Sequence, residues 1–296
     1  MKRIIAILLA CVSVLAVLSC TVLCVSAEEE ASPSLTLVYR RSDEACGGLG
    51  VCTYRIGELS DNGDYRLCGR FADYPVQVYS VESQTEWRRI TSTLVSYIEA
   101  DAITPDLEGV TDSEGKATYS GVGAGLYLTL SVRMADDGAT VVFEDFITAV
   151  SDTDVSAYPK HETQYPVPGD VEFKVVKQWK DTGARDKRPS TVKVDILREG
   201  SVVESVTLSQ ENDWCYSWMA PDDRSAWYAV EREVPEGYKV SVTSDGRTIV
   251  ITNTYETQTE PPDTGDTEVL WHYLVLLFAS GALLITLGVI RMRMEK

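Results

Sequence analysis

The feature that most constrains this chain is a long apolar run near its C-terminus, at residues 269–290. A run of about 20 apolar residues is long enough to cross a bilayer as a helix. Arg291, Arg293 and Lys296 follow it, and basic residues of this kind stay on the cytoplasmic side of a span. The sequence therefore predicts a transmembrane helix at 269–290, a cytoplasmic basic tail at 291–296, and an extracellular position for everything upstream.

The N-terminus carries a second apolar run. Lys2 and Arg3 precede an apolar stretch that ends in small residues at Ala27. This order is typical of a secretory signal peptide, which we predict at residues 1–27. An alternative is a lipoprotein cleavage box that ends at Cys20, and the chain is exported in either case.

Composition excludes several classes of function. The 45 acidic and 27 basic residues give a formal net charge of −18, which is unsuited to binding nucleic acid. The two histidines are His161 and His272, and the second lies inside the predicted membrane span. A Ser-His-Asp or Cys-His mechanism therefore has no suitable base, and a His-rich zinc site has no ligands. We predict no turnover enzyme, no cofactor and no metal.

Four cysteines remain in the predicted extracellular part, where disulfides are permitted. Cys52 and Cys68 flank residues 61–64, a turn sequence of the kind that closes a β-hairpin. We predict a Cys52–Cys68 disulfide, with Cys46–Cys68 as the alternative. Cys215 lies far away in the sequence and is expected to be a buried free thiol.

The first extracellular domain is predicted at residues 34–160 and consists mainly of short strands. Two of the clearest are 34–39 and 125–132. One helix is predicted at 86–101, where apolar residues recur at three- and four-residue spacing and form one face. Residues 111–116 read as a turn in which a glycine takes a positive φ.

A short linker, 161–169, leads to a second predicted domain at 170–256, and residues 257–268 connect that domain to the membrane span. Short strands separated by turns suggest a β-sandwich. The predicted fold is therefore mainly β, with two tandem β-sandwich domains of immunoglobulin-like or prealbumin-like type, the first containing one helix. The candidate strands of the second domain are 171–179, 191–198, 201–208, 214–218, 227–231 and 248–254.

Two motifs of the first domain resemble those of Gram-positive pilin-like proteins. Thr111 through Leu128 is similar to the pattern TDxxGxAxYxGxxxGLYL, which accompanies their N-terminal domains. Residues 157–160 resemble the YPKN element, whose lysine attacks a sortase-bound threonine of the next subunit. The resemblance implies that Lys160 is a pilin lysine, although His161 replaces the usual asparagine.

The segment before the membrane span resembles the LPxTG sorting signal of Gram-positive surface proteins. The resemblance implies that a sortase cuts between Thr264 and Gly265 and joins the new carboxyl group to a cell-wall amine. The alternative is a permanent single-pass anchor. Proline replaces the usual leucine at the first position, which leaves the class of sortase open; the pentapeptide is Pro261, Pro262, Asp263, Thr264 and Gly265.

Segments at the start, middle and end of the second domain resemble the Cna B-type fold of bacterial adhesins and pilins; they are residues 175–179, 227–231 with 234–238, and 251–255. In that family a lysine and an asparagine form a spontaneous isopeptide bond, assisted by a buried acid. The resemblance implies Lys177, Asn253 and Glu231 for these roles. Alternation along the strand turns Lys177 toward the core. Glu233 lies two residues after Glu231 and therefore shares its strand face, which makes it the alternative acid. The alternative to an isopeptide bond is a buried Lys–Glu ion pair without covalent chemistry.

These observations predict a structural surface protein, a stalk or minor pilin, attached covalently to the cell wall of a Gram-positive bacterium. The implied partners are a sortase, peptidoglycan or pilin subunits, and the membrane before sorting. A second class is an adhesin whose N-terminal domain binds a host or cell-surface ligand. A third class, a wall-attached Asp/Glu glycosidase, is disfavoured because no carboxylate pair stands at a recognisable spacing.

Overall fold

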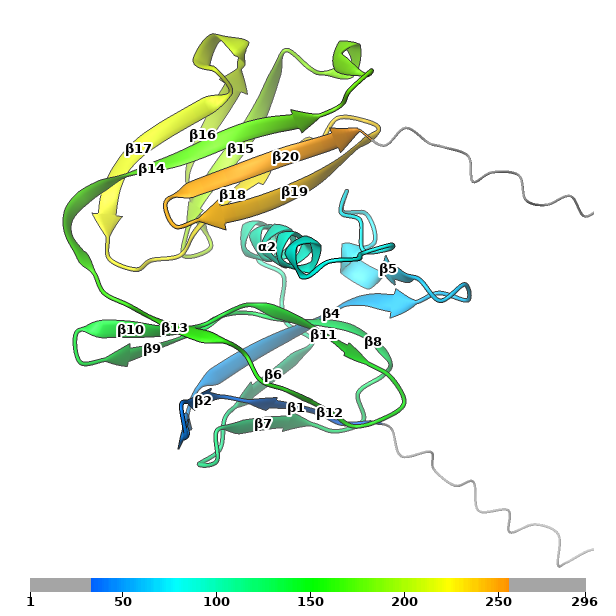
Figure 1. Ribbon diagram of the computed structural model, residues 1–296, viewed down its shortest axis with the longest axis vertical. Helices are drawn as coiled ribbons and strands as arrows, with labels where there is room; N and C mark the ends of the chain where they lie inside the picture. The colour runs from blue at the N-terminus through cyan, green and yellow to red at the C-terminus, as the bar shows by residue number, and fades with distance from the viewer. Residues whose placement is uncertain (1–32, 256–296) are drawn as a thin grey trace, which may run out of the picture. The chain divides into compact units, whose positions relative to one another are not determined.

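The computed structural model describes residues 33–255 (Figure 1). The predicted signal peptide, the sorting pentapeptide 261–265, the span 269–290 and the basic tail lie outside the described residues. Within residues 33–255, no helix has the length and apolar character needed to cross a membrane.

The fold is mainly β with one α-helix among the described residues, which confirms the predicted fold class. We call residues 33–164 the N-terminal region. Its elements in chain order are β1 (Leu35–Val38), β2 (Arg40–Arg41), β3 (Glu44–Ala45), β4 (Gly50–Leu59), β5 (Tyr65–Leu67), η1 (Gly69–Phe71), α2 (Gln84–Asp101), β6 (Leu107–Val110), β7 (Lys116–Tyr119), β8 (Gly125–Thr129), β9 (Val132–Asp136), β10 (Ala139–Phe143), β11 (Phe146–Val150), β12 (Val155–Ala157) and β13 (His161–Gln164).

The main sheet of the N-terminal region has strand order β11-β8-β4-β5, with β6 also paired to β4. Its strand β8 is covered on both faces, since all five residues of β8 are buried. Tyr127 packs in one core with the residues of β1 and β10, whereas Leu126 and Leu128 belong to a second core that includes α2. The near-continuous apolar sequence of β8 follows from this position between two layers.

Helix α2 begins at a capping box, in which the Ser83 side chain accepts a hydrogen bond from Glu86 N and the Glu86 carboxylate accepts one from Ser83 N. The predicted apolar face is present, with Ile90, Leu94 and Ile98 buried. The polar residues Thr93 and Ser96 are buried as well, so the helix is covered on more than one side.

The sandwich, as we call residues 167–255, consists of two sheets with orders β17-β14-β20-β19 and β16-β15-β18. Five of the six predicted strands agree with the structure to within a few residues at each end, and the sixth, 214–218, is the first half of a longer strand. The bounds are β14 (Val167–Lys180), η2 (Arg185–Lys187), β15 (Thr191–Arg198), β16 (Ser201–Ser209), η3 (Gln210–Asn212), β17 (Cys215–Asp222), β18 (Trp227–Glu231), β19 (Tyr238–Asp245) and β20 (Thr248–Tyr255).

Strand β19 was missed by the sequence analysis, although Tyr238, Val240 and Val242 alternate with polar residues as a half-buried strand does. The predicted linker at 161–169 contains β13, which pairs with β10, and the first residues of β14. The chain therefore passes from the N-terminal region into the sandwich almost entirely in extended, paired strands.

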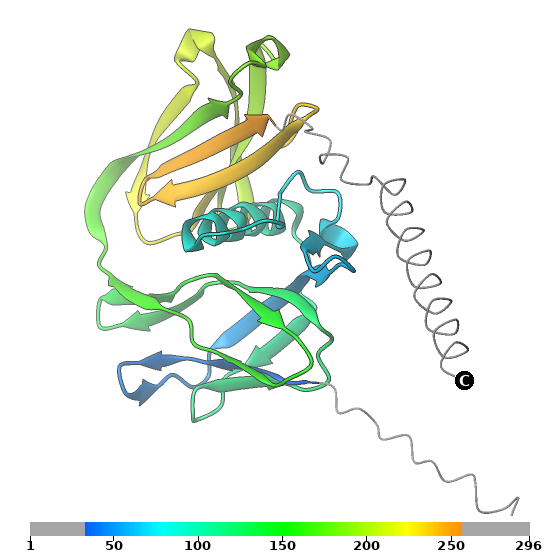
Figure 2. The same cartoon turned by 45° about the vertical axis from the view of Figure 1, so that its right-hand side comes forward.

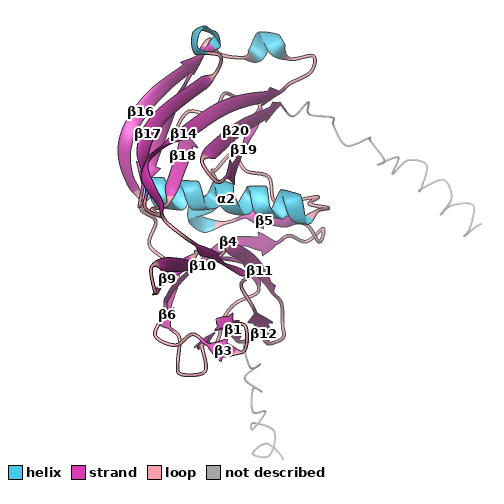
Figure 3. Cartoon of the chain, turned by 60° about the vertical axis from the view of Figure 1, so that its left-hand side comes forward, coloured by secondary structure: helices cyan, strands magenta, loops and turns pink. Residues whose placement is uncertain are grey.

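Helix α2 connects the two parts of the fold. It contacts β11 of the N-terminal region on one side and β18 and β19 of the sandwich on the other. Figures 2 and 3 show the helix running between the sheets of the two parts. One hydrophobic core cluster extends from Ile56 through Leu94 to Ile251, so the described residues share a continuous interior.

The structure does not contain the predicted Cys52–Cys68 disulfide or its alternative Cys46–Cys68. All four cysteines of the described residues are free thiols. The turn at 61–64 does close the β4–β5 hairpin, with Ser60 N donating to Asp64 O. The register of that hairpin is the reason for the error: Cys68 N donates to Ile56 O, so Cys68 lies opposite Ile56 and not opposite Cys52. Cys46 is buried and Cys215 is half-buried.

Gly115 occupies a tight turn between β6 and β7, where its N–H donates to Asp112 O. Its φ is +75°, a left-handed conformation that glycine adopts without strain. A Cβ atom at this position would lie 2.3 Å from the carbonyl oxygen of Tyr39. The turn therefore requires glycine both for its backbone conformation and for the close approach of a neighbouring chain segment.

We predict that Gly115→Ala lowers the free energy of unfolding by about 3 kcal/mol, because the left-handed conformation and the backbone clash add together. Gly121→Ala is the matched control, since Gly121 has φ +73° but open space around it, and it should cost only about 1 kcal/mol. Urea unfolding of the two variants measures the difference. Equal losses would show that the contact with Tyr39 contributes nothing.

A buried Lys–Glu–Asn cluster in the sandwich

Lys177 lies on β14, a strand inside the four-stranded sheet of the sandwich. Alternation along β14 places Phe173, Val175 and Lys177 on the buried face, while Gln178 is exposed. The Lys177 side chain is fully inaccessible to solvent. A lysine at this position is unusual, because a buried ammonium group is costly unless it is paired or neutral.

Asn253 lies on β20, the strand that pairs with β14 in parallel. The register places Lys177 opposite Ile251, and Asn253 is two residues further along the same strand. Residues two apart share a face of a sheet, so Asn253 faces the same interior as Lys177. It is fully buried.

Glu231 is the last residue of β18, which forms one edge of the opposite sheet. Its side chain is also fully inaccessible. Glu233, the residue of equal parity, lies beyond the end of β18 and is exposed. The fold thus brings one side chain from each of three strands together between the two sheets; we call Lys177, Glu231 and Asn253 the Lys–Glu–Asn cluster.

The cluster is held by two polar contacts. Lys177 Nζ lies 3.4 Å from Glu231 Oε2, and Asn253 Nδ2 donates to Glu231 Oε1 at 2.9 Å. Lys177 Nζ also donates to the carbonyl oxygen of Gln178 at 3.2 Å and lies 4.2 Å from the centre of the Trp179 ring. Among the described residues, Asn253 Oδ1 has no hydrogen-bond partner, although it is buried.

Burial shifts both titratable groups toward their neutral forms. Desolvation lowers the pKa of Lys177 to about 8, although the neighbouring Glu231 carboxylate opposes this shift. Desolvation likewise raises the pKa of Glu231 above its ordinary value, against the opposing effects of Lys177 and Asn253. The two shifts favour a neutral Lys177 amine and a protonated Glu231, and the Glu231 carboxyl group contacts the Asn253 carboxamide.

This arrangement has a definite chemical capacity. A neutral amine is a nucleophile, and a protonated carboxyl group can donate a hydrogen bond to a carbonyl oxygen. If the Asn253 amide is turned by 180°, its unpaired Oδ1 accepts a hydrogen bond from protonated Glu231. The cluster therefore contains the nucleophile, the electrophile and the proton donor of an acyl transfer within one buried site.

A second buried polar group, which the sequence analysis did not single out, stands at the end of β14. The Asp181 carboxylate accepts two hydrogen bonds from the Arg188 guanidinium and one from Tyr238 Oη at 3.0 Å. Arg188 also lies against the Trp179 ring. This group fixes the end of β14 close to Lys177, and no short-range spacing in the sequence connects its three members.

The other predicted site residues lie elsewhere. Lys160 is exposed in the connection between β12 and β13, where its carbonyl oxygen accepts a hydrogen bond from Glu144 N at 2.8 Å. His161 begins β13 and contacts the ring of Phe143. Neither residue belongs to the Lys–Glu–Asn cluster, and the sorting pentapeptide lies beyond the described part of the chain.

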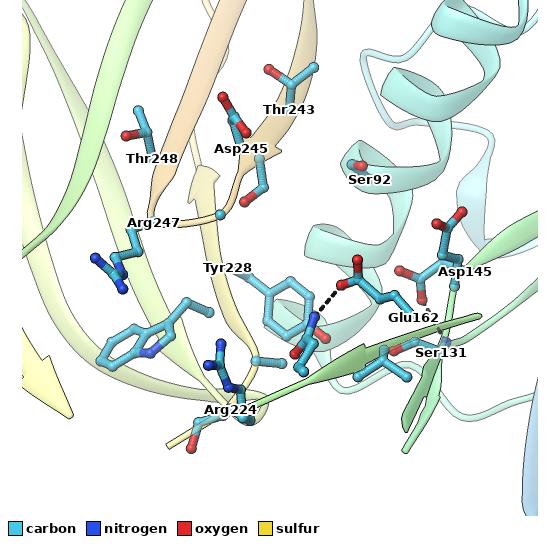
Figure 4. Close-up of a pocket in the computed structure, with 18 of the residues that line it drawn as sticks. Ser92, Ser131, Asp145, Glu162, Arg224, Tyr228, Thr243, Asp245, Arg247 and Thr248 are labelled. Carbon is cyan, nitrogen blue, oxygen red and sulfur yellow. Dashed lines mark hydrogen bonds between the residues drawn. The ribbon is translucent and has the colours of Figure 1, made fainter. Parts of the chain in front are cut away.

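A cavity of about 960 Å³ lies between α2, the N-terminal region and the sandwich (Figure 4). Its lining includes five arginines and five carboxylates, and some of them pair with one another, as Arg247 does with Asp222. Asp145 accepts a hydrogen bond from Ser131 N, and desolvation raises its pKa. Because both signs of charge are equally represented, the lining indicates no single class of ligand.

Comparison with known families supports the resemblance seen in the sequence. Residues 173–254 match the Cna protein B-type domain. The collagen adhesin of Staphylococcus aureus is 27% identical over 124 residues, which cover 39% of this chain and 10% of the adhesin. The match thus spans about a tenth of that relative's length. The matched residues 173–254 make up most of the sandwich.

Solved structures similar to this chain include surface proteins and pilins. A single B repeat unit of the collagen-binding surface protein of Staphylococcus aureus has a TM-score of 0.28 at 14% identity, covering 75% of this chain and 96% of that structure. The full-length major pilin SpaD from Corynebacterium diphtheriae has a TM-score of 0.28 at 16% identity, covering 77% of this chain and 65% of that structure.

The Asp181–Arg188 pair predicts a pH-dependent contribution to stability. Hydrogen bonds from Arg188 hold the pKa of Asp181 below its ordinary value. A depressed folded-state pKa contributes stability above the unfolded pKa of about 3.9, and the contribution is lost as pH falls through the folded value. Asp181→Asn should therefore cost about 2 kcal/mol at pH 7 and progressively less below about pH 4. Urea unfolding at several pH values measures this loss of stability. Asp186→Asn is the control, because Asp186 is exposed. A cost of Asp181→Asn that does not change with pH would contradict the prediction.

Proposed function

We propose that this chain is a structural protein of the bacterial cell surface, a stalk or minor pilin, whose Cna B-type domain carries an autocatalytic isopeptide bond between Lys177 and Asn253. The observation that carries the proposal is the fully buried position of Lys177, Glu231 and Asn253, with Glu231 in contact with both of the other side chains. The Cna B-type match over residues 173–254 supports it.

The proposed reaction is a single transamidation. Neutral Lys177 Nζ attacks Asn253 Cγ, a new Nζ–Cγ bond forms, and the Cγ–Nδ2 bond breaks. Glu231 relays one amine proton to Nδ2, which leaves as ammonia, so the acid is regenerated and no other reactant is needed. Holding the groups in contact replaces a bimolecular encounter by an oriented intramolecular step. The bond forms once per molecule and is a maturation step, not turnover.

The bond would connect the first strand of the domain to its last. β14 enters from the N-terminal region and β20 ends at Tyr255, so tension along the chain pulls on these two neighbouring strands. Without a covalent link, only non-covalent contacts resist it, among them the parallel hydrogen bonds between these two strands. The crosslink would also remove conformations from the unfolded chain, as a disulfide does.

We predict that the folded ectodomain, residues 33–255, weighs one ammonia less than its sequence when measured by intact mass spectrometry. Lys177→Met should abolish this deficit, because the nucleophile is lost while the stem still fills the core. Glu231→Gln should leave most molecules at full mass, because no acid relays the proton.

Lys174→Met is the matched control, since Lys174 lies on the exposed face of the same strand and should retain the deficit. A wild-type ectodomain that folds but has its full sequence mass would show that the cluster is only a buried ion pair.

Attachment to the wall is proposed through the pentapeptide 261–265, and polymerisation through Lys160. The exposed position of Lys160 supports the second part, because an acyl-enzyme must be able to reach its amine. In wall extracts of the producing bacterium, an immunoblot should show a ladder of high-mass species that disappears in Lys160→Ala. Exposed Lys187→Ala should leave the ladder intact. A single sharp band in the wild type would indicate a wall protein that does not polymerise.

A further inference from the structure

Strands β18 and β19 are each an edge strand of their sheet, and β16 and β17 are the edges at the other side of the sandwich. Left uncovered, β18 and β19 would expose unpaired backbone groups, and we call the side of the sandwich that they form its open side. Helix α2, which belongs to the N-terminal region, contacts both of these strands. Glu231 is the last residue of β18, so the open side lies directly beside the Lys–Glu–Asn cluster.

The N-terminal region satisfies the edge of β19 by specific hydrogen bonds. Val242 N donates to Thr93 Oγ1 at 2.7 Å, and Val240 N donates to Pro75 O at 2.9 Å. Val240 lies opposite Asn253 in the β19–β20 register. Strand β19, which pairs with β20 at Asn253, is therefore held by residues from outside the sandwich.

The edge at β18 is held in the same way. Tyr97 Oη of α2 donates to the carbonyl oxygen of Glu231 at 3.4 Å, and Tyr97 is 6% exposed. The next residue, Arg232, donates to Asp101 Oδ1 at 2.5 Å and to Ala100 O at 3.2 Å, both at the end of the same helix. The Glu231 carbonyl and the Arg232 side chain are thus both held by α2.

We propose that α2 completes the crosslinking site, so that the isopeptide bond forms rapidly only after the helix of the N-terminal region has docked on the sandwich. Thr93 and Tyr97 are positioning residues in this reaction, because they act through β19 and Glu231. The inference rests on the proposed Lys177–Asn253 crosslink and adds that a second part of the chain controls it.

The physical basis is water exclusion. Desolvation is the main cause of the pKa shifts of both Lys177 and Glu231. The charged and titratable groups around the pair are Asp181 just after β14, Arg188 just after η2, Tyr97 on α2 and Arg232 just after β18. If water enters beside Glu231, the pKa of Lys177 rises and the pKa of Glu231 falls. Each unit by which the two pKa values move apart lowers the population of neutral Lys177 with protonated Glu231 about tenfold.

The test uses the ectodomain recovered unreacted from inclusion bodies and refolded at several pH values. Loss of ammonia is followed by intact mass, and tryptophan fluorescence gives the folded fraction. The reaction rate of the wild type should be highest over a pH plateau. It should fall above about pH 8, where the Lys177–Glu231 pair loses its last proton, and we call this fall the alkaline limb of the pH–rate profile. Tyr97→Ala should react at least about tenfold more slowly per folded molecule, with its alkaline limb moved to higher pH.

Leu37→Ala is the matched control, because Leu37 is fully buried in the separate core of the N-terminal region. It should destabilise that region and still react at the wild-type rate per folded molecule, with an unshifted limb. A purely structural role of Tyr97 would give the same result. If folded Tyr97→Ala reacts at the wild-type rate and its alkaline limb lies at the wild-type pH, the proposal is overturned.

If Tyr97→Ala does not fold, the combination of Thr93→Val and Tyr97→Phe decides, since both changes keep the side-chain volume and remove only the hydroxyl contacts. A shifted alkaline limb supports the role of α2, and an unshifted limb overturns it. Absence of any ammonia loss in the wild type refutes the crosslink itself, which separates failure of the proposed function from failure of this inference.

Discussion

The exclusion of water from Lys177, Glu231 and Asn253 is the constraint on which the rest of the structure depends. Burying an isolated ammonium or carboxylate is expensive, and removing one partner of a buried pair is costly for the same reason. The sandwich tolerates the pair because each group contacts the other and both shift toward neutrality. The same desolvation that makes the buried pair expensive favours the neutral, nucleophilic form of the Lys177 amine.

Keeping that site dry requires more than the sandwich alone provides. Two sheets bury their facing side chains but leave an open side at β18 and β19. Helix α2 covers this side with Thr93 and Tyr97 while its Leu94 and Ile98 belong to the core shared with β4 and β8. A helix placed in this way packs on two sheets at once, which explains why its polar as well as its apolar residues are buried.

The connectivity suits a protein that carries load. β13 pairs within the N-terminal region, β14 crosses the sandwich, and β20 lies beside β14 in parallel. Entry and exit of the sandwich are therefore neighbouring strands. Asp181, Arg188 and Tyr238 fix the end of β14 by charge-assisted hydrogen bonds, close to the residues that we propose to be joined.

The sequence by itself determined the local features: the alternation that forms the strands, the three- and four-residue spacing that forms α2, the turn at Gly115, and the inward orientation of Lys177. These depend on residues that are neighbours in the chain. Only the tertiary structure decided the register of the β4–β5 hairpin, which separates Cys52 from Cys68, the pairing of Asp181 with Arg188, and the exposure that distinguishes Glu231 from Glu233. It also decided that α2 closes the open side of the sandwich, because a contact between Tyr97 and Glu231 depends on how distant segments pack and leaves no periodic signal in the sequence.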